Sequence, residues 1–341
     1  MNLIKKERDS NMELLRLVAM FLVLVVHADF FSLGMPTYRD VMCTPSNAFM
    51  RFFFESLSFV CVNVFVLISG WFGICPNKRS FCKFVFQCLF FLVGIYVALL
   101  LTKHTYLSTE GVKGCLVMLQ WNWFIKAYIG LYILAPTLNV FVQNADRNAQ
   151  KSVLVSFFVF QTVYSWLNDA AIFFEQGYST MSFIGLYLLA RYIKVFKPHW
   201  AYMSSMYYLI AFGIFTFVLS VTAFFTTQVK VWRLADLIYL YVNPLVIVSS
   251  ICLLLFFSGM RLKSKVVNRL ASSSFAIFLL HTNPNLCKPY FATNVVRIYN
   301  AFDGIICLGC IMAFLIAVAF AAILIDQFRI LLWNHIASKY L

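Results

Sequence analysis

Charged residues are scarce in this chain. Of its 341 residues only 13 are Asp or Glu, and the charged types together make up 12%, while 62% of the residues are hydrophobic. A soluble globular domain has about a quarter charged residues and about half apolar residues. The composition therefore excludes a soluble globular chain and indicates one that crosses a membrane several times.

Several motifs with a defined chemistry are also missing. Eight of the ten cysteines are scattered singly, Cys307 and Cys310 form one CxxC spacing inside the last apolar run, and the five histidines include no HExxH spacing. We therefore expect the cysteines to be small buried residues, and we expect neither a disulfide framework nor a metal site. The sequence has no glycine-rich phosphate-binding loop and no GxSxG nucleophile elbow, so neither of these chemistries is indicated.

Long apolar runs fill most of the chain. A run of about 17 to 25 apolar residues is long enough to cross a bilayer as a helix. The candidate runs lie near 12–30, 48–72, 81–102, 121–142, 152–167, 181–197, 203–225, 237–257, 268–286 and 304–333. We therefore predict an all-α fold, a polytopic membrane protein built as a bundle of about ten transmembrane helices. No linker between the runs is long enough for a second domain, so we expect residues 1–341 to form a single integral-membrane domain.

The net charge of +14 would suggest a nucleic-acid partner in a soluble protein. In a membrane protein the first question is on which side the positive charges collect. If the N-terminus is cytoplasmic, seventeen of the 27 Lys and Arg residues fall in cytoplasmic segments and nine in the opposite ones. This asymmetry predicts that both termini are cytoplasmic, and it explains the charge without nucleic acid. We expect a multi-pass protein of the cell inner membrane.

The first run, MELLRLVAMFLVLVVHADF, carries two ionisable side chains, Arg16 and His27. At 100° per residue, their separation of eleven positions comes to about 20° past three full turns, so they share one helix face, ~16 Å apart along the axis. Ionisable groups persist inside a membrane where they face a protein interior or a water-filled cavity. The spacing therefore indicates a polar path through the bundle.

Two further residues extend this pattern. His281, near the outer end of the run 268–286, is predicted at the same depth as His27. Two imidazoles beside one cavity can move a proton near neutral pH, although each can equally be a histidine bonded to a neighbouring carbonyl. Glu13 lies three residues before Arg16 and close enough to pair with it. Arg16 is thus expected either to meet an anionic group from the cytoplasm or to neutralise a helix end with Glu13.

Several stretches resemble one family, the membrane-bound acyltransferases of the acyltransferase-3 type. The first is ELLRLVAMFLVLVVH, in which ten residues separate an arginine from a histidine. Four more follow in the family's order, VNVFVLISGWF, WNWFIKAYIGLYILAPTLN, FIGLYLLARYI and NRLASSSFAIFLLHTNP, and together the five span nearly the whole chain.

The resemblance implies transfer of an acyl group, usually acetyl, from cytoplasmic acyl-CoA to a hydroxyl of a cell-envelope carbohydrate. It implies His27 as catalytic base and Arg16 as a residue for the donor or for the structure of the site. Many members have an aspartate where this chain has Asn63. The role of that aspartate is therefore not assigned to Asn63. Acyl-CoA, a carbohydrate acceptor and membrane lipid are the expected partners, with no cofactor beyond the co-substrate.

The oxyanion that forms on the thioester needs a hydrogen-bond donor. Residue types suited to this role are available at Asn63, Ser69, Trp123 and His281. Tryptophan in a membrane protein is also a common interfacial anchor, and a Ser-Gly pair such as Ser69-Gly70 allows close helix packing. Each of these residues therefore keeps a structural interpretation beside the chemical one.

Two other functions use similar residues. A proton-coupled transporter or flippase for a lipid-linked sugar also has membrane histidines and a buried arginine, but no internal repeat is evident in this chain. A polysaccharide polymerase or glycosyltransferase usually relies on large outer loops or on carboxylates. This sequence has short outer loops and only 13 Asp and Glu residues, so acyl transfer is the favoured prediction.

Overall fold

The computed structural model describes residues 8–115, 122–167 and 173–340, which form helices joined by short connections, with no strand among them. The longer elements are α1 (Ser10–Val26), α3 (Pro45–Ser58), α4 (Cys61–Phe72), α5 (Lys78–Leu101), α7 (Trp123–Asn144), α8 (Arg147–Leu167), α9 (Thr180–Phe196), α10 (Ser205–Gln228), α12 (Pro244–Gly259) and α17 (Gly304–Tyr340). The shorter ones are η1 (His27–Phe31), α2 (Tyr38–Cys43), α6 (Thr109–Gly114), η2 (Glu175–Gly177), η3 (His199–Ala201), α11 (Trp232–Ile238), α13 (Lys265–Ala271), α14 (Ser274–His281), α15 (Pro284–Leu286), η4 (Cys287–Ala292) and α16 (Thr293–Ala301).

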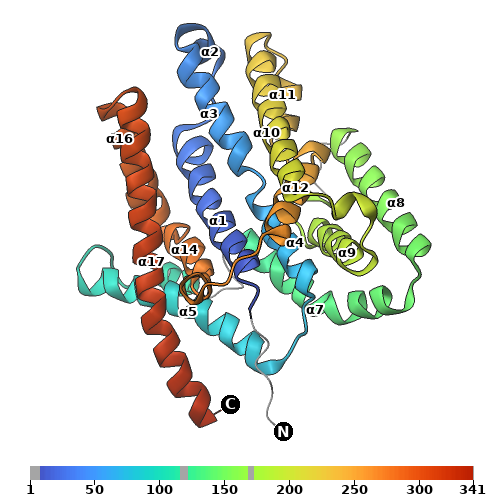
Figure 1. Ribbon diagram of the computed structural model, residues 1–341. Helices are drawn as coiled ribbons and strands as arrows, with labels where there is room; N and C mark the ends of the chain where they lie inside the picture. Colours follow the sequence, from blue (N-terminus) through green and yellow to red (C-terminus); the bar gives the residue numbers. More distant parts are fainter. Residues whose placement is uncertain (1–7, 116–121, 168–172, 341) are drawn as a thin grey trace.

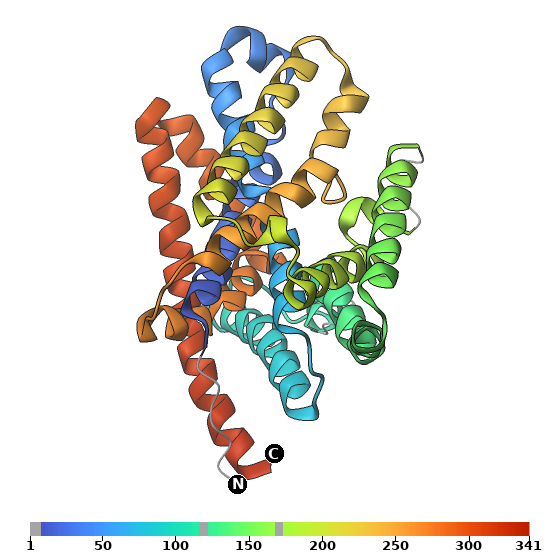
Figure 2. The same cartoon turned by 45° about the vertical axis from the view of Figure 1, so that its right-hand side comes forward.

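The helices are arranged around α1. It packs against α3, α4, α12, α13, α14 and α17. Residues on most sides of α1 are buried, as expected for a helix that is apolar all round, and they include Met12, Leu15, Ala19 and Leu24. In both views α17 stands at one edge of the molecule, and α8 and α9 stand on the opposite side (Figures 1 and 2). The first helix of the chain therefore holds the bundle together.

Long apolar helices confirm the membrane-protein prediction. Within the described residues, six helical stretches are long and apolar enough to span a membrane: 10–31, 45–72, 78–101, 123–144, 205–228 and 304–338. Each of the ten predicted runs contains helix. The remaining four lie on α8, α9, α12 and the α13–α14 region, which are shorter or less apolar. Residue 121, the first of one predicted run, lies outside the described residues.

Besides the run 48–72, which is divided into α3 and α4 at residues 59–60, two predicted runs are not continuous helices. In the run 237–257, helix α12 begins only at Pro244, because Asn243 caps it by accepting a hydrogen bond from the Leu245 amide at 2.9 Å. Asparagine at the N-cap followed by proline is a strong helix start. The run 268–286 is divided into α13, α14 and α15 by breaks at 272–273 and 282–283. Apolar composition alone did not reveal these interruptions.

The glycine of the Ser69-Gly70 pair permits a close helix crossing. A Cβ atom at Gly70 would overlap the backbone of Tyr187 on α9. Helices α4 and α9 make one of the most extensive contacts of the bundle, and small residues at such crossings let two backbones approach. The packing interpretation of Gly70 therefore holds.

One charge assigned to a cytoplasmic segment is instead buried. Arg329 on α17 is 0% exposed and bonds Asp326 through Nε at 2.9 Å and Nη2 at 2.7 Å. The Gln87 amide on α5 donates to the same carboxylate at 2.9 Å. Buried charges require such pairing, so Asp326 both neutralises Arg329 and links α17 to α5 through Gln87.

Candidate functional site

His27 begins the π-helical turn η1 that follows α1. Its Nδ1 atom lies 2.7 Å from Nε2 of His281, at the end of α14. The two rings are tilted by 51°, with centroids 5.0 Å apart. Single π-helical turns occur frequently at functional sites. In this one the first residue, His27, contacts His281. The structure thus brings together the two imidazoles that the sequence placed at one depth.

Hydrogen bonding defines which nitrogen of each ring carries a proton. His281 Nδ1 lies 2.6 Å from the Ile277 carbonyl oxygen, which accepts hydrogen bonds only, so this nitrogen is the donor. Neutral His281 then has an unprotonated Nε2, which accepts from the Nδ1–H group of His27. The remaining nitrogen of His27, Nε2, is left with a free lone pair. With both rings neutral, these contacts leave Nε2 of His27 able to accept a proton while its Nδ1 is bonded to His281.

A narrow cavity of about 30 Å³ lies beside His27. This is room for about one water molecule. Most of its walls are apolar, but Trp123, Cys61 and Tyr241 also line it. Trp123 packs edge-on against Tyr178, with ring centroids 4.5 Å apart. Of the predicted oxyanion donors outside the histidine pair, Trp123 is thus the one that lines this cavity.

Asn63 has a different position. It is 1% exposed on α4, and its Nδ2 atom donates to the Tyr241 carbonyl at 2.9 Å. Tyr241 belongs to the non-helical segment 239–243 between α11 and α12. Its own amide donates to the Gln176 carbonyl at 3.1 Å. Irregular backbone at membrane depth is tolerated only where protein groups or a cavity satisfy it. Asn63 supplies one of these bonds, and it does not line the His27 cavity.

Ser69 lies further along α4, away from His27. Its hydroxyl donates to the Phe65 carbonyl at 3.1 Å and lies 3.3 Å from the Tyr128 hydroxyl. Tyr128 lines a second pocket, of about 180 Å³, between α5 and α7. Ser69 therefore belongs with this second pocket.

A layer of aromatic rings separates the two cavities. Phe124 and Phe278 line the cavity beside His27, whereas Tyr128 and Phe84 line the second pocket. Phe124 stacks on Tyr128 with centroids 6.0 Å apart. Phe275 stacks on Phe84 at 5.5 Å and on Phe278 at 5.8 Å, so the rings are continuous. Side-chain movement of these rings would be needed to join the cavities.

Arg16 and Glu13 form an ion pair on α1. Arg16 Nη1 lies 2.7 Å from Glu13 Oε2, and the side chains are 28% and 9% exposed. Arg16 is also within electrostatic reach of Tyr128 in the second pocket. His27 lines the smaller cavity, whereas Arg16 lines neither of the two.

Two features of this region were missed in the sequence. Tyr241 was taken as part of an apolar helix, although the Asn243-Pro244 pair is a recognisable helix start. Asp29, two residues after His27, pairs with Arg51 of α3 at 2.7 Å. An acidic residue next to the membrane histidine was a visible signal, but its partner is 22 positions away and no local pattern identifies it.

Comparison with known proteins agrees with this arrangement. A family model described as an acyltransferase domain, of the acyltransferase-3 type, matches residues 9–325, nearly the whole chain. No curated protein matches, and no solved structure matches. The matched region includes both histidines, the ion pair of α1 and both cavities. The chain therefore belongs to the acyltransferase-3 family, whose members are membrane acyltransferases.

Proposed function

We propose that this protein transfers an acyl group, acetyl in the first instance, from cytoplasmic acyl-CoA to a hydroxyl of a cell-envelope carbohydrate. The observation that carries this proposal is the histidine pair, in which His281 orients His27 and leaves its Nε2 unprotonated. A sugar hydroxyl is a poor nucleophile until a base removes its proton. A general base of this kind typically accelerates attack by about 10²- to 10⁴-fold.

In the proposed reaction the acceptor's hydroxyl proton moves to His27 Nε2 while its oxygen attacks the thioester carbonyl carbon. The positive charge on His27 is shared with His281 through the Nδ1–Nε2 hydrogen bond. The tetrahedral oxyanion collapses, the C–S bond breaks, and the CoA thiolate takes the proton back from His27. Trp123, which lines the cavity, is suited to donate its indole N–H to the oxyanion.

The donor path follows the arginine–histidine face of α1. The pantetheine arm of CoA is thin and uncharged, and its length is on the order of the ~16 Å that separates Arg16 from His27 along the helix. In this proposal the phosphates stay near the Arg16 end and the arm enters through the pocket that Tyr128 lines. The aromatic layer at Phe275 then opens to admit the thioester and otherwise keeps water from the His27 cavity.

The path fixes an orientation for the chain. We infer that the start of α1 faces the cytoplasm and that the protein lies in the cell inner membrane, in agreement with the excess of Lys and Arg on that side. Single cysteines introduced at exposed Lys78 and Arg39, in a variant with the native cysteines replaced, test this orientation. A membrane-impermeant thiol reagent applied to intact cells should label position 39 and spare position 78. The opposite pattern would overturn the donor path.

The activity itself is tested with membranes that contain the protein and with acetyl-CoA radiolabelled in the acetyl group. Label should appear in a lipid-extractable or polymeric glycan, and mild alkali should release it as acetate, since the product is an ester. Membranes without the protein provide the background. If every envelope glycan is supplied in turn and the label still stays in acetyl-CoA, the proposed function is contradicted.

A further inference from the structure

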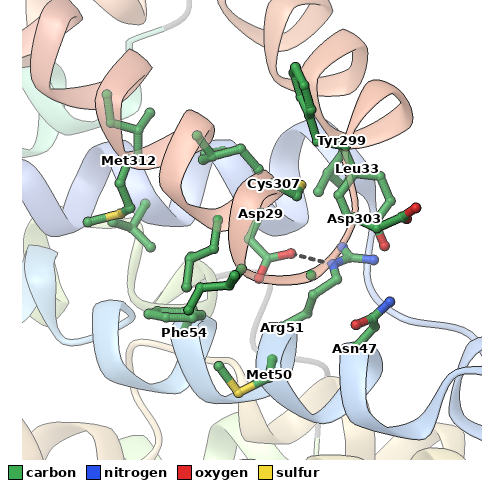
Figure 3. A pocket seen from close by; sticks show the side chains of 18 residues that line it. Asp29, Leu33, Asn47, Met50, Arg51, Phe54, Tyr299, Asp303, Cys307 and Met312 are labelled. Carbon is green, nitrogen blue, oxygen red and sulfur yellow. Dashed lines mark hydrogen bonds and ion pairs between the residues drawn. The ribbon is translucent and has the colours of Figure 1, made fainter.

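A third, larger pocket lies against η1 and is lined there by Ala28 and Asp29. It encloses about 420 Å³ between α1, α3 and the α16–α17 region (Figure 3). Most of its wall is apolar, and this part includes Val25, Phe54, Leu308, Ile311, Met312 and Leu315. The mechanism proposed above does not use this pocket. Its volume and apolar walls fit a hydrocarbon chain.

Polar side chains gather at one end of this pocket (Figure 3). Arg51 Nε lies 2.7 Å from Asp29 Oδ1, and these side chains are only 14% and 10% exposed. Arg51 also donates to the Gly34 carbonyl and lies 5.7 Å from the centroid of the Tyr299 ring. Asn47 and Asp303 complete this end. The pocket is therefore amphipathic, with a defined polar head and an apolar body.

The charges at the polar end restrict what can bind there. Two carboxylates, Asp29 and Asp303, face one guanidinium, Arg51, whose Nε is already paired. A phosphate would be repelled by the carboxylates. A neutral group rich in hydroxyls can donate to carboxylates, bond the Asn47 amide and lie against the Tyr299 ring. Sugar head groups have this chemistry.

We propose that this pocket binds the acceptor as a glycolipid, with an uncharged sugar at Asp29, Arg51 and Asp303 and its hydrocarbon chain along α17. The inference rests on the proposed function and names the acceptor class. Asp29 is two residues from His27 on the same π-helical turn. A lipid anchored here therefore holds its glycan at the level of the histidine pair. The hydroxyl that is acylated belongs to the part of the glycan that extends past η1 to His27.

The test measures binding without acyl transfer. An alkyl glucoside with a photoreactive diazirine in its chain is incubated with the protein in phospholipid nanodiscs, and labelled peptides are mapped by mass spectrometry. Labels should concentrate on the α3 and α17 residues that line the pocket. Met312→Trp, which fills the pocket, should reduce them about fivefold or more. Ile316→Trp, on the lipid-exposed side of the same helix at 57% exposure, is the matched control and should leave them unchanged.

Two further comparisons complete the experiment. Met50→Trp fills the pocket from the α3 wall and should repeat the loss if Met312→Trp does not fold. An unlabelled alkyl glucoside should compete at lower concentration than an alkyl phosphate. Equal labelling in the pocket variants and Ile316→Trp, or stronger competition by the phosphate, would overturn the proposal. Because no acetyl-CoA is present, these results stand apart from the acetyl-transfer assay, whose failure alone would contradict the proposed function.

Discussion

Nδ1 of His27 lies 2.7 Å from Nε2 of His281 across 254 positions of sequence, and His281 is fixed in turn by the Ile277 carbonyl. His281→Ala should therefore lower turnover by about 10- to 100-fold, less than the loss of a general base itself. His281→Gln, whose side-chain oxygen can still accept from His27, should retain more activity. Initial rates at equal amounts of folded protein test this order. Full activity in His281→Ala would remove the orienting role.

Arg16 is expected to act on the donor side of the reaction. Arg16→Ala should raise the KM for acetyl-CoA more than the KM for the acceptor, and Arg16→Lys should not restore it, because an ammonium lacks the planar two-pronged contact of a guanidinium. Rates measured against each substrate in isolated membranes show the difference.

The Glu13 partner supplies the control for this prediction. Arg16 and Glu13 are 2.7 Å apart, and paired residues are not additive when mutated. If the pair serves only to neutralise the helix end, Glu13→Ala should damage activity as much as Arg16→Ala, and the double variant should be no worse than either. Unchanged kinetics in Arg16→Lys would contradict an arginine-specific role.

Asn63 should act on stability rather than on the chemical step. Asn63→Ala leaves the buried Tyr241 carbonyl without the amide that now donates to it, which costs about 1–3 kcal/mol. Ser69→Ala removes a partly buried hydroxyl with a local carbonyl bond and should cost less. Thermal unfolding in detergent compares the two variants. A fully stable but inactive Asn63→Ala would instead support its role as an oxyanion donor.

The sequence predicted the helical content and the membrane class because both follow from composition and from the length of apolar runs. It also placed His27 and His281 at one depth, since the spacing along a helix fixes depth. It did not predict the 2.7 Å contact between them, because that depends on how α14 packs on α1.

The other features that the sequence did not predict also depend on contacts between residues far apart in the chain. Composition did not distinguish a continuous helix over 237–257 from α12 starting at Pro244, because residues 239–242 are apolar or aromatic although their backbone is held by tertiary bonds. The burial of Arg329 was not predicted because it depends on the α5–α17 contact, where Gln87 donates to the Arg329 partner Asp326 from 239 positions away. The bond from Asn63 to the Tyr241 carbonyl was not predicted because the two residues are 178 positions apart.

The Asp326–Arg329 pair makes a prediction about stability. Both side chains are 0% exposed, so Asp326→Ala leaves a buried unpaired guanidinium and should cost about 3–5 kcal/mol. A double variant, Asp326→Leu with Arg329→Met, should recover most of this loss because it buries no charge. Unfolding in detergent at increasing temperature measures both. Loss of stability in the double variant equal to that in Asp326→Ala would argue against the unpaired charge as the cause.

The central claim is that His27 is the base for acyl transfer, and its most direct test is the rate of transfer from labelled acetyl-CoA to glycan by His27→Ala. The variant should still insert, with its stability lowered by about 1–3 kcal/mol for the bond lost to buried His281, while its rate falls by at least about 10²-fold. His27→Gln, which keeps polarity but not basicity, should be equally inactive. A rate within threefold of wild type in either variant, at equal protein in the membrane, would contradict the account.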